Sequence, residues 1–282
     1  MKWSRLQNIV ILVLVVVNVF LLTLVTTREV RSARLEREAR TAAAAVLEQN
    51  GIAVDEDALP DNMTLQPCRV ERDRTAEHAL AEALLGEVTE EARGGGVFRY
   101  AGAGGKGSVQ FHSGGNLSAA FSEEAYPLGG QSLEEHAAAL MASLQLEGTV
   151  CAVEGMGGTG SVTVRQSWQG VPVYTCTMLL KYEDGALRSI TEGQWLLGAS
   201  VPEPVGAALD VPTALIRFLN GCNELGDVCS SVERMEAGYV MTANLSGQAR
   251  LTPVWQFEAE TGAYQMDAVT GVFTRADVLP GI

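Results

Sequence analysis

Three kinds of residue in this chain invite a chemical interpretation: a glycine-rich segment, the histidines and several paired carboxylates. The glycine-rich segment AGAGGKGS occupies positions 101–108. A phosphate-binding loop needs Gly-Lys followed directly by Ser or Thr, and then a helix whose amino terminus faces the phosphate. Here Gly107 follows Lys106, and the VQF sequence that comes next predicts a strand. The segment is therefore predicted to be a hairpin tip.

The three histidines, His78, His112 and His136, are too far apart in sequence to form a recognisable metal motif. A zinc-binding helix carries two ligands one helical turn apart, and no such pair occurs here. His78 and His136 lie on predicted helices beside Glu77 and Glu135, so we expect both rings to face solvent. The sequence predicts no metal site.

The acidic residues and serines do not complete a catalytic set. Solvated carboxylates are expected at helix ends and surfaces, and three glutamate pairs lie there: Glu90-Glu91, Glu123-Glu124 and Glu134-Glu135. The sequence contains neither Gly-x-Ser-x-Gly nor Ser-x-x-Lys, the patterns that activate a serine nucleophile. We predict that the chain is not an enzyme and binds no cofactor.

Cysteine usage and net charge exclude two further classes of protein. The five cysteines are too scattered for a disulfide scaffold: Cys68, Cys151, Cys176, Cys222 and Cys229. Cys222 and Cys229 could pair across a short loop, but buried free thiols are favoured. A net charge of −14 excludes nucleic acid as a partner, because phosphate binding needs clustered Lys and Arg.

The first 27 residues predict a transmembrane signal anchor. Between Ile9 and Val25 only Asn18 and Thr23 are polar, and a helix of that length nearly crosses a hydrocarbon layer of roughly 30 Å. No small-x-small cleavage site follows the apolar run. Basic residues flank it on both sides, so charge counting leaves the topology open. Asn18 is interpreted either as a contact with another membrane helix or as a residue satisfied locally or by water.

Beyond the anchor, the patterns predict an α+β chain. Residues 28–50 lack Gly and Pro until the Asn50-Gly51 stop signal, and they predict a helical juxtamembrane stalk. Further helices are predicted at 75–92, 133–146 and 211–220, and the second has Ser132 and Glu135 as a capping box. Short strands follow each helix. A helix followed by an antiparallel meander therefore recurs, twice clearly and once in part.

Two stretches of the chain resemble a known family. Trp3-Ser4-Arg5 runs straight into the apolar span, as in YycI-type proteins. Near the end, the pattern of Pro253, Trp255, Tyr264, Asp267 and Gly271 is similar to the closing hairpins of YycI and PepSY-like domains. Residues 51–130 match no motif and are assigned to a first α+β unit, while residues 131–282 are assigned to a YycI/PepSY-like domain with two helix-plus-sheet repeats.

The resemblance implies a single-pass Gram-positive membrane protein whose C-terminal domain lies outside the cytoplasm. Its partners would be the lipid bilayer, a cell-wall-controlling sensor histidine kinase and a YycH-type protein. Trp3, Ser4, Arg5 and Asn18 would contact a kinase helix in the membrane, and Pro253, Trp255, Tyr264, Asp267 and Gly271 would be fold-motif residues. The leading hypothesis is therefore a non-enzymatic regulator of that kinase. The alternative is a PepSY-like inhibitory or chaperone module for an extracytoplasmic peptidase, which would pair a sheet edge with a client segment.

Overall fold

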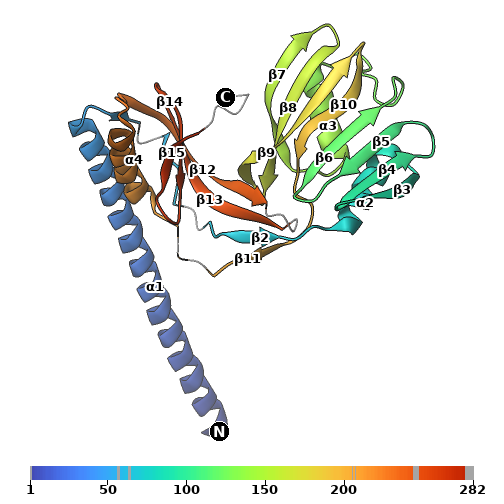
Figure 1. Ribbon diagram of the computed structural model, residues 1–282. Coiled ribbons are helices and arrows are strands. Elements are labelled where there is room, and N and C mark those ends of the chain that lie inside the picture. Colours follow the sequence, from blue (N-terminus) through green and yellow to red (C-terminus); the bar gives the residue numbers. More distant parts are fainter. Residues whose placement is uncertain are drawn as a thin grey trace.

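A computed structural model describes residues 2–55, 58–62, 65–204, 206, 208–243 and 248–276. In the first 30 residues the helical backbone is described from Lys2 onward, but the side chains of only some residues are described, Leu14, Asn18 and Phe20 among them. The fold is α+β, with many strands and few helices. Figure 1 shows a long helix projecting from a body of two lobes. The helices are α1 (Lys2–Gln49), α2 (Arg74–Leu85), α3 (Leu133–Ser143) and α4 (Val211–Leu225).

Helix α1 continues without a break for 48 residues, about 72 Å at 1.5 Å per residue. It ends where the sequence predicted, because Gly51 has a φ of +83° that closes the last turn. The predicted stalk is thus the carboxyl-terminal half of one continuous helix. Searching the described residues finds no helix with the length and hydropathy required to cross a membrane.

The large lobe holds one antiparallel sheet of eight strands in the order β7-β8-β9-β10-β6-β5-β4-β3. Its strands are β3 (Val88–Gly94), β4 (Val97–Gly102), β5 (Gly107–Phe111), β6 (Asn116–Phe121), β7 (Gly148–Met156), β8 (Thr159–Trp168), β9 (Val171–Glu183) and β10 (Ala186–Gln194). Two meanders, β3–β6 and β7–β10, make up this sheet, and each is preceded by a helix. They join through their last strands, β6 and β10.

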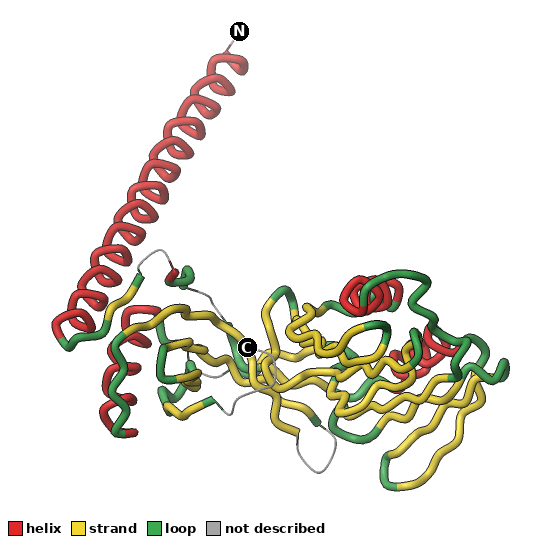
Figure 2. The backbone as a smooth tube through the Cα atoms, turned by 90° about the horizontal axis from the view of Figure 1, so that it is seen from above, coloured by secondary structure: helices red, strands yellow, loops and turns green. Residues whose placement is uncertain are grey.

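The small lobe holds the third meander, β12 to β15, which follows α4. Three strands from elsewhere in the chain complete its sheet: β1 pairs with β12, β2 pairs with β13, and β11 pairs with β2. The bounds are β1 (Ala53–Val54), β2 (Cys68–Val70), β11 (Ser200–Pro202), β12 (Ser231–Ala243), β13 (Ala249–Ala259), β14 (Gly262–Asp267) and β15 (Phe273–Arg275). Viewed from above in Figure 2, α1 leads away from this lobe.

Strand pairing in the structure crosses the predicted boundary at residue 130. Strands β1 and β2 belong to the small lobe, although they precede the first meander in sequence. The second predicted repeat joins the first along the β6–β10 ladder, and it meets the third at the Val173–Tyr239 pair. Pairing between distant strands decides this grouping, and a local sequence pattern carries no information about it.

Three predicted helix ends differ from those in the structure. Helix α3 ends at Ser143 and not at residue 146. Helix α2 ends at Leu85 because Gly86, at φ +80°, leaves the helical conformation. Residues 88–92, which were predicted to be helical, belong to strand β3. Helix α4 passes through Gly221 and ends at Gly226, which adopts the left-handed C-cap conformation. Gly221 is needed inside the helix because the Phe273 ring packs where a Cβ would lie. The capping box of Ser132 and Glu135 is confirmed at the start of α3.

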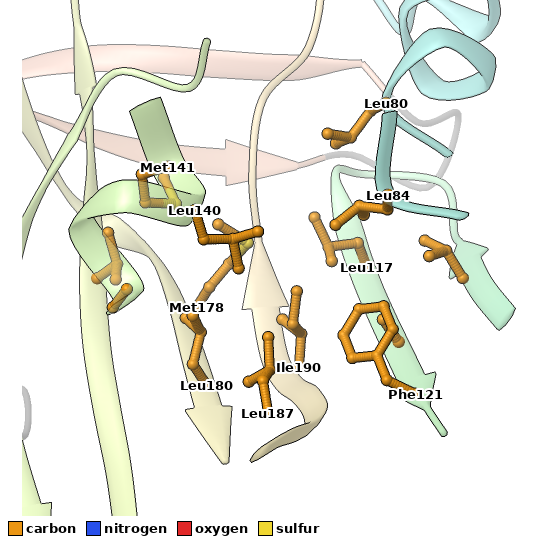
Figure 3. Close-up of a cluster of buried hydrophobic side chains, with 14 of the residues drawn as sticks. Leu80, Leu84, Leu117, Phe121, Leu140, Met141, Met178, Leu180, Leu187 and Ile190 are labelled. Carbon is orange, nitrogen blue, oxygen red and sulfur yellow. The ribbon is translucent and has the colours of Figure 1, made fainter. Parts of the chain in front are cut away.

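Each lobe has its own core. Figure 3 shows that in the large lobe α2 and α3 contribute leucines to the same cluster as strands β6, β9 and β10, for example Leu84, Leu140 and Leu180. In the small lobe, α4 and the last turns of α1 pack on β12 to β14, where Leu47, Phe218 and Trp255 are buried together. Because Leu47 belongs to this core, α1 is part of the folded body and not an appendage.

A third cluster joins the lobes. It contains Val173 of β9, Tyr239 of β12 and Cys68 of β2, and Val173 and Tyr239 also pair as parallel strand neighbours. Gly238 is required beside this pair, since a Cβ there would lie 2.3 Å from the Tyr174 ring. The lobes therefore meet through close backbone packing.

Candidate functional site

The histidines occupy three different environments. His78 lies 3.5 Å from Glu82 on the surface of α2, as expected for a solvated side chain. The expectation for His136 is wrong, because its ring is buried and its Nδ1 lies 3.1 Å from the Tyr182 hydroxyl. Burial lowers the pKa of this imidazole. His136 is on the α3 face that packs against the sheet. The acidic residues next to it in the sequence do not indicate this burial.

The glutamate pairs serve the surface and the helix ends. Glu90 forms an ion pair with Arg74 at 2.5 Å, and Glu123 forms one with Arg188 at 2.5 Å. Glu135 accepts from the backbone N–H of Ser132 at 2.9 Å as the capping box, and these bonds lower the pKa of its carboxyl. None of these three carboxylates is paired with a second acid in the way that general acid–base chemistry needs.

The thiols and potential metal ligands form no reactive cluster in the described part of the chain. Every cysteine is a free thiol, and all except Cys151 are buried. Burial raises the pKa of Cys176 and of Cys222 to about 12, so neither is a thiolate at neutral pH. Among the described residues no group of three metal-ligating side chains comes together.

A cleft of about 520 Å³ lies beside the large-lobe sheet where α3, the β8–β9 hairpin and the β10–β11 connection meet. Gln166 forms its floor: the side-chain amide donates to Leu196 O at 2.8 Å and accepts from Leu196 N at 2.9 Å. Trp168 also lines the cleft, and its Nε1 is buried without an acceptor among the described residues. Glu147, Ser167 and Ser200 also line the cleft, and its volume falls in the range typical of small-molecule sites.

A second, apolar groove of about 490 Å³ lies between α1 and α4. The α1 wall consists of Ala39, Ala42, Ala43 and Val46, and Ile216 lies on the α4 wall. Ala43 is buried in the small-lobe core, whereas Val46 is 39% exposed. The groove therefore begins where the projecting helix enters the body, and its dimensions suit a helix or an apolar side chain.

The fold-motif residues of the C-terminal meander all serve the small lobe. Trp255 is buried and donates from Nε1 to Leu209 O at 2.9 Å, which ties β13 to the loop before α4. The Pro253 carbonyl accepts from Ala268 N at 2.9 Å. Tyr264 stacks on Phe273 and donates to Asp227 at 2.9 Å.

Asp267 and Gly271 shape the turn between β14 and β15. One carboxylate oxygen of Asp267 accepts from the backbone N–H groups of Val269 and Thr270, each at 2.8 Å. Gly271 has a φ of +75°, a conformation that residues with a Cβ rarely adopt. Turn formation and packing account for the pattern, and no motif residue lines either the cleft or the groove.

The residues predicted to contact a membrane helix all lie on α1. Asn18 is exposed and belongs to the amino-terminal half of α1, whereas the buried residues Ala43, Ala44 and Leu47 lie near the other end of this helix. The side chains of Trp3, Ser4 and Arg5 lie outside the description. The structure brings none of the four to the C-terminal motif residues.

Sequence reasoning missed a buried ion pair at the point where the chain passes from the small lobe to the large one. Arg72 binds Glu77 through two bonds, Nε to Oε1 at 2.5 Å and Nη2 to Oε2 at 2.9 Å. Arg72 also donates to Gly96 O at 2.5 Å, and Glu77 is 4% exposed. Arg72 precedes α2 and Glu77 lies five residues later, in its first turn. This spacing does not predict an ion pair, because the pair becomes buried only when β4 and β5 pack against it.

Comparison with known proteins leaves the family open. No family model matches the chain, and no curated protein matches its sequence. An uncharacterized protein from Eubacterium rectale ATCC 33656 superposes with a TM-score of 0.46 and 11% identity, over 80% of this chain and 90% of that one. The Bacillus megaterium YpeB C-terminal domain gives a TM-score of 0.38 and 13% identity, over 74% and 99% respectively. Neither likeness assigns the chain to a family.

Proposed function

We propose that this protein is a membrane-tethered, non-enzymatic regulator whose two-lobed body lies outside the cytoplasm and binds a partner protein. The partner we propose is a sensor histidine kinase that controls the cell wall, together with a YycH-type protein. The resemblance of Trp3-Ser4-Arg5 and of the Pro253-to-Gly271 pattern to YycI-type proteins supports this choice. The absence of a reactive cluster among the described side chains is compatible with it.

The observation that carries the proposal is the continuity of α1. Its amino-terminal part is apolar on several sides, with Leu14, Val17 and Phe20 each about half exposed or more. A helix that is apolar all round belongs in lipid or in a protein core, and the body covers none of these three residues. At the other end Leu47 is fully buried in the small lobe. A rotation or tilt of the tether would therefore be passed directly to the body.

Geometry also sets how far the body stands from the bilayer. If Ile9–Val25 spans the membrane, residues 26–42 separate the lipid from the first buried turn of α1. At 1.5 Å per residue this distance is about 25 Å. A body at that height would meet the membrane-proximal part of a partner's outer domain. Tighter binding to one signalling state of the kinase, by about 1–3 kcal/mol, would bias its activity.

The test uses the full chain and the full-length kinase together in lipid nanodiscs. A photo-crosslinking residue at position 18 should give an adduct with a kinase membrane helix or with another α1 helix. The same residue at position 104, on a hairpin tip of the large lobe, is the control. Addition of the chain should change the autophosphorylation rate of the kinase severalfold, and Asn18→Leu should reduce that change. An unaltered rate with the wild-type chain would refute the proposed regulation.

The alternative function is favoured by strand β7. It lies at one edge of the large-lobe sheet, and in the described structure only β8 pairs with it. Val153 and Met156 on this strand are 43% and 89% exposed. An exposed apolar edge can add a client strand, as a PepSY-like inhibitory or chaperone module for an extracytoplasmic peptidase would need.

The two functions differ in their response to a block on that edge. Val153→Pro removes a backbone donor from β7, and Val153→Lys adds a charge that opposes strand addition. If both variants leave kinase regulation intact but abolish inhibition of a peptidase, the alternative holds. If neither variant affects a client and Asn18→Leu affects the kinase, the first proposal holds.

A further inference from the structure

Eight residues of α1 follow a seven-residue spacing along one side of the helix. One row has Asn18, Ser32, Ala39 and Val46, and the other has Leu14, Leu21, Leu35 and Ala42. We call these residues the heptad stripe. In the sequence, Val25 and Arg28 fill the remaining positions of the two rows. Every member of the heptad stripe is exposed, so the stripe is not used by the folded body.

Spacings of three and four residues that alternate over this length define the contact face of a left-handed coiled coil. Leu35 is the most informative member. It is 58% exposed and sits in the stalk between Arg34 and Glu36, where water would surround an unpaired helix. A single exposed leucine needs no explanation, but this one falls in register with Leu14, Leu21 and Ala42.

The carboxyl-terminal end of the heptad stripe lies in the apolar groove between α1 and α4. Ala39, Ala42 and Val46 belong to both, and Ile216 of α4 forms the opposite wall. The small alanines allow another helix backbone to approach closely, and α4 would flank it. Groove and stripe thus lie on the same side of α1.

We propose that this surface binds the same surface of a second copy of the chain, and that the two α1 helices form a parallel, in-register coiled coil. The inference rests on the membrane tether of the proposed function, because two copies anchored in one bilayer present their α1 helices side by side and at equal height. It identifies the helix that meets Asn18 as another α1. A polar residue such as asparagine in this position fixes the register of paired helices.

Charge complementarity supports a second copy over an unrelated helix. In a parallel coiled coil, the residue just before a first-row position on one helix faces a residue five positions later on the other helix. That later residue directly follows a second-row position. Arg31 and Glu36 occupy these two positions, so each copy contributes one half of two symmetric ion pairs. Arg31 is exposed, and Glu36 is half-buried, with its Oε1 accepting from Asn62 at 2.6 Å. An antiparallel arrangement would not bring these residues together.

Disulfide crosslinking of the full chain in membranes tests the pairing. In a Cys151→Ser background, which removes the one thiol that is not buried, single cysteines replace Ser32, Leu35 or Ala39 on the heptad stripe. Ala33→Cys and Arg37→Cys are the controls on other sides of the same helix. Two differently tagged copies are expressed together and oxidised with copper phenanthroline.

The expected product is a disulfide-linked pair carrying both tags, formed at the three heptad positions at least fivefold more than at the controls. Adducts with a different protein, equal yields at all five positions or no adduct would overturn the proposal. Membrane fractionation of the same samples tests the tether separately. A soluble chain that still crosslinks at heptad positions would contradict the proposed membrane tether and support the pairing of α1 helices. A membrane-bound chain without crosslinks would support the tether and contradict the pairing.

Charge reversal tests the register. Arg31→Glu sets one carboxylate opposite Glu36 in each of the two pairs and should lower the crosslinking yield of Ser32→Cys roughly threefold to tenfold. Adding Glu36→Arg to the same chain should restore the yield. Leu35→Glu should abolish crosslinking without changing the urea unfolding of the body, because Leu35 makes no part of either core. Failure of the second reversal to restore the yield would refute the parallel register.

Discussion

At the scale of single residues, the paired glutamates that the sequence singled out form ion pairs and a helix cap, whereas no sequence pattern indicated the Arg72–Glu77 ion pair. Arg72 and Glu77 hold the passage between the lobes through two bonds to each other and one to Gly96. Arg72 also lies 5.2 Å from the centre of the Phe98 ring. Since Glu77 is buried, losing one partner leaves the other without compensation.

Glu77→Gln should lower the free energy of unfolding by about 2–4 kcal/mol, because the partly buried Arg72 would keep its charge without a counter-ion. Urea unfolding followed by tryptophan fluorescence measures the change. Glu91→Gln is the matched control, since Glu91 pairs with Arg93 at 2.9 Å on an exposed strand. It should cost less than about 1 kcal/mol. Equal effects of the two substitutions would contradict the importance assigned to the buried pair.

His136 should make the large lobe sensitive to mild acid. Burial lowers the pKa of its imidazole from the ordinary 6.5, so the unfolded chain takes up a proton more readily than the folded one. The stability that is present above pH 6.5 is then lost as the pH falls through and below that value. Between pH 7.5 and pH 5.5, His136→Gln should lose less unfolding free energy than the wild-type chain. An equal loss in the two proteins would contradict this role of His136.

At the scale of elements, local sequence predicted which segments fold as helices and strands, and packing decided where several of them end. Helix α4 continues past Gly221 because the Phe273 ring occupies the space of the missing side chain. Helix α2 stops at Gly86 although the apolar spacing continues to Val88, which instead begins a strand. In the second and third meanders short strands follow the helix as predicted, since period-2 patterns and glycine turns are local signals.

Helix α1 is attached to the body mainly through Leu47, which is fully buried beside α4. Leu47→Ala should destabilise the small lobe by about 2–4 kcal/mol, from lost burial and the cavity left behind. Val46→Ala, one residue earlier and 39% exposed, should cost less than about 1 kcal/mol. Denaturant unfolding compares them. If both variants unfold like the wild type, α1 is not anchored as described, and the proposed coupling between tether and body fails.

At the scale of the whole molecule, function depends on how rigidly the parts are joined. The two lobes meet where β9 and β12 pair at Val173 and Tyr239, with the Thr175 hydroxyl accepting from Met241 N at 2.7 Å. The Tyr239 hydroxyl donates to Gln66 O at 3.2 Å, which ties the segment before β2 to the same place. A partner that binds one lobe would therefore also orient the other.

Gly238→Ala tests this junction. A Cβ would lie 2.3 Å from the Tyr174 ring and 2.9 Å from the Pro172 carbonyl oxygen, so the lobes must shift apart. We expect a loss of about 1–3 kcal/mol in unfolding free energy and a larger radius of gyration by small-angle X-ray scattering. Gly104→Ala is the control, because nothing lies within 4 Å of its Cβ position. An unchanged radius together with unchanged stability would show that the junction tolerates the methyl group.

The sequence by itself determined the local elements: the helical stalk with its Asn50-Gly51 stop, the Ser132–Glu135 cap and the recurring helix-plus-meander pattern. These depend on residues a few positions apart, whose spacing is legible in the chain. Only the tertiary structure decided that β6 pairs with β10, that β1 and β2 complete the small-lobe sheet, and that His136 and Glu77 are buried. It also exposed the heptad stripe and formed the groove beside it. Burial is decided by which distant segments meet, and nearby sequence does not encode that meeting.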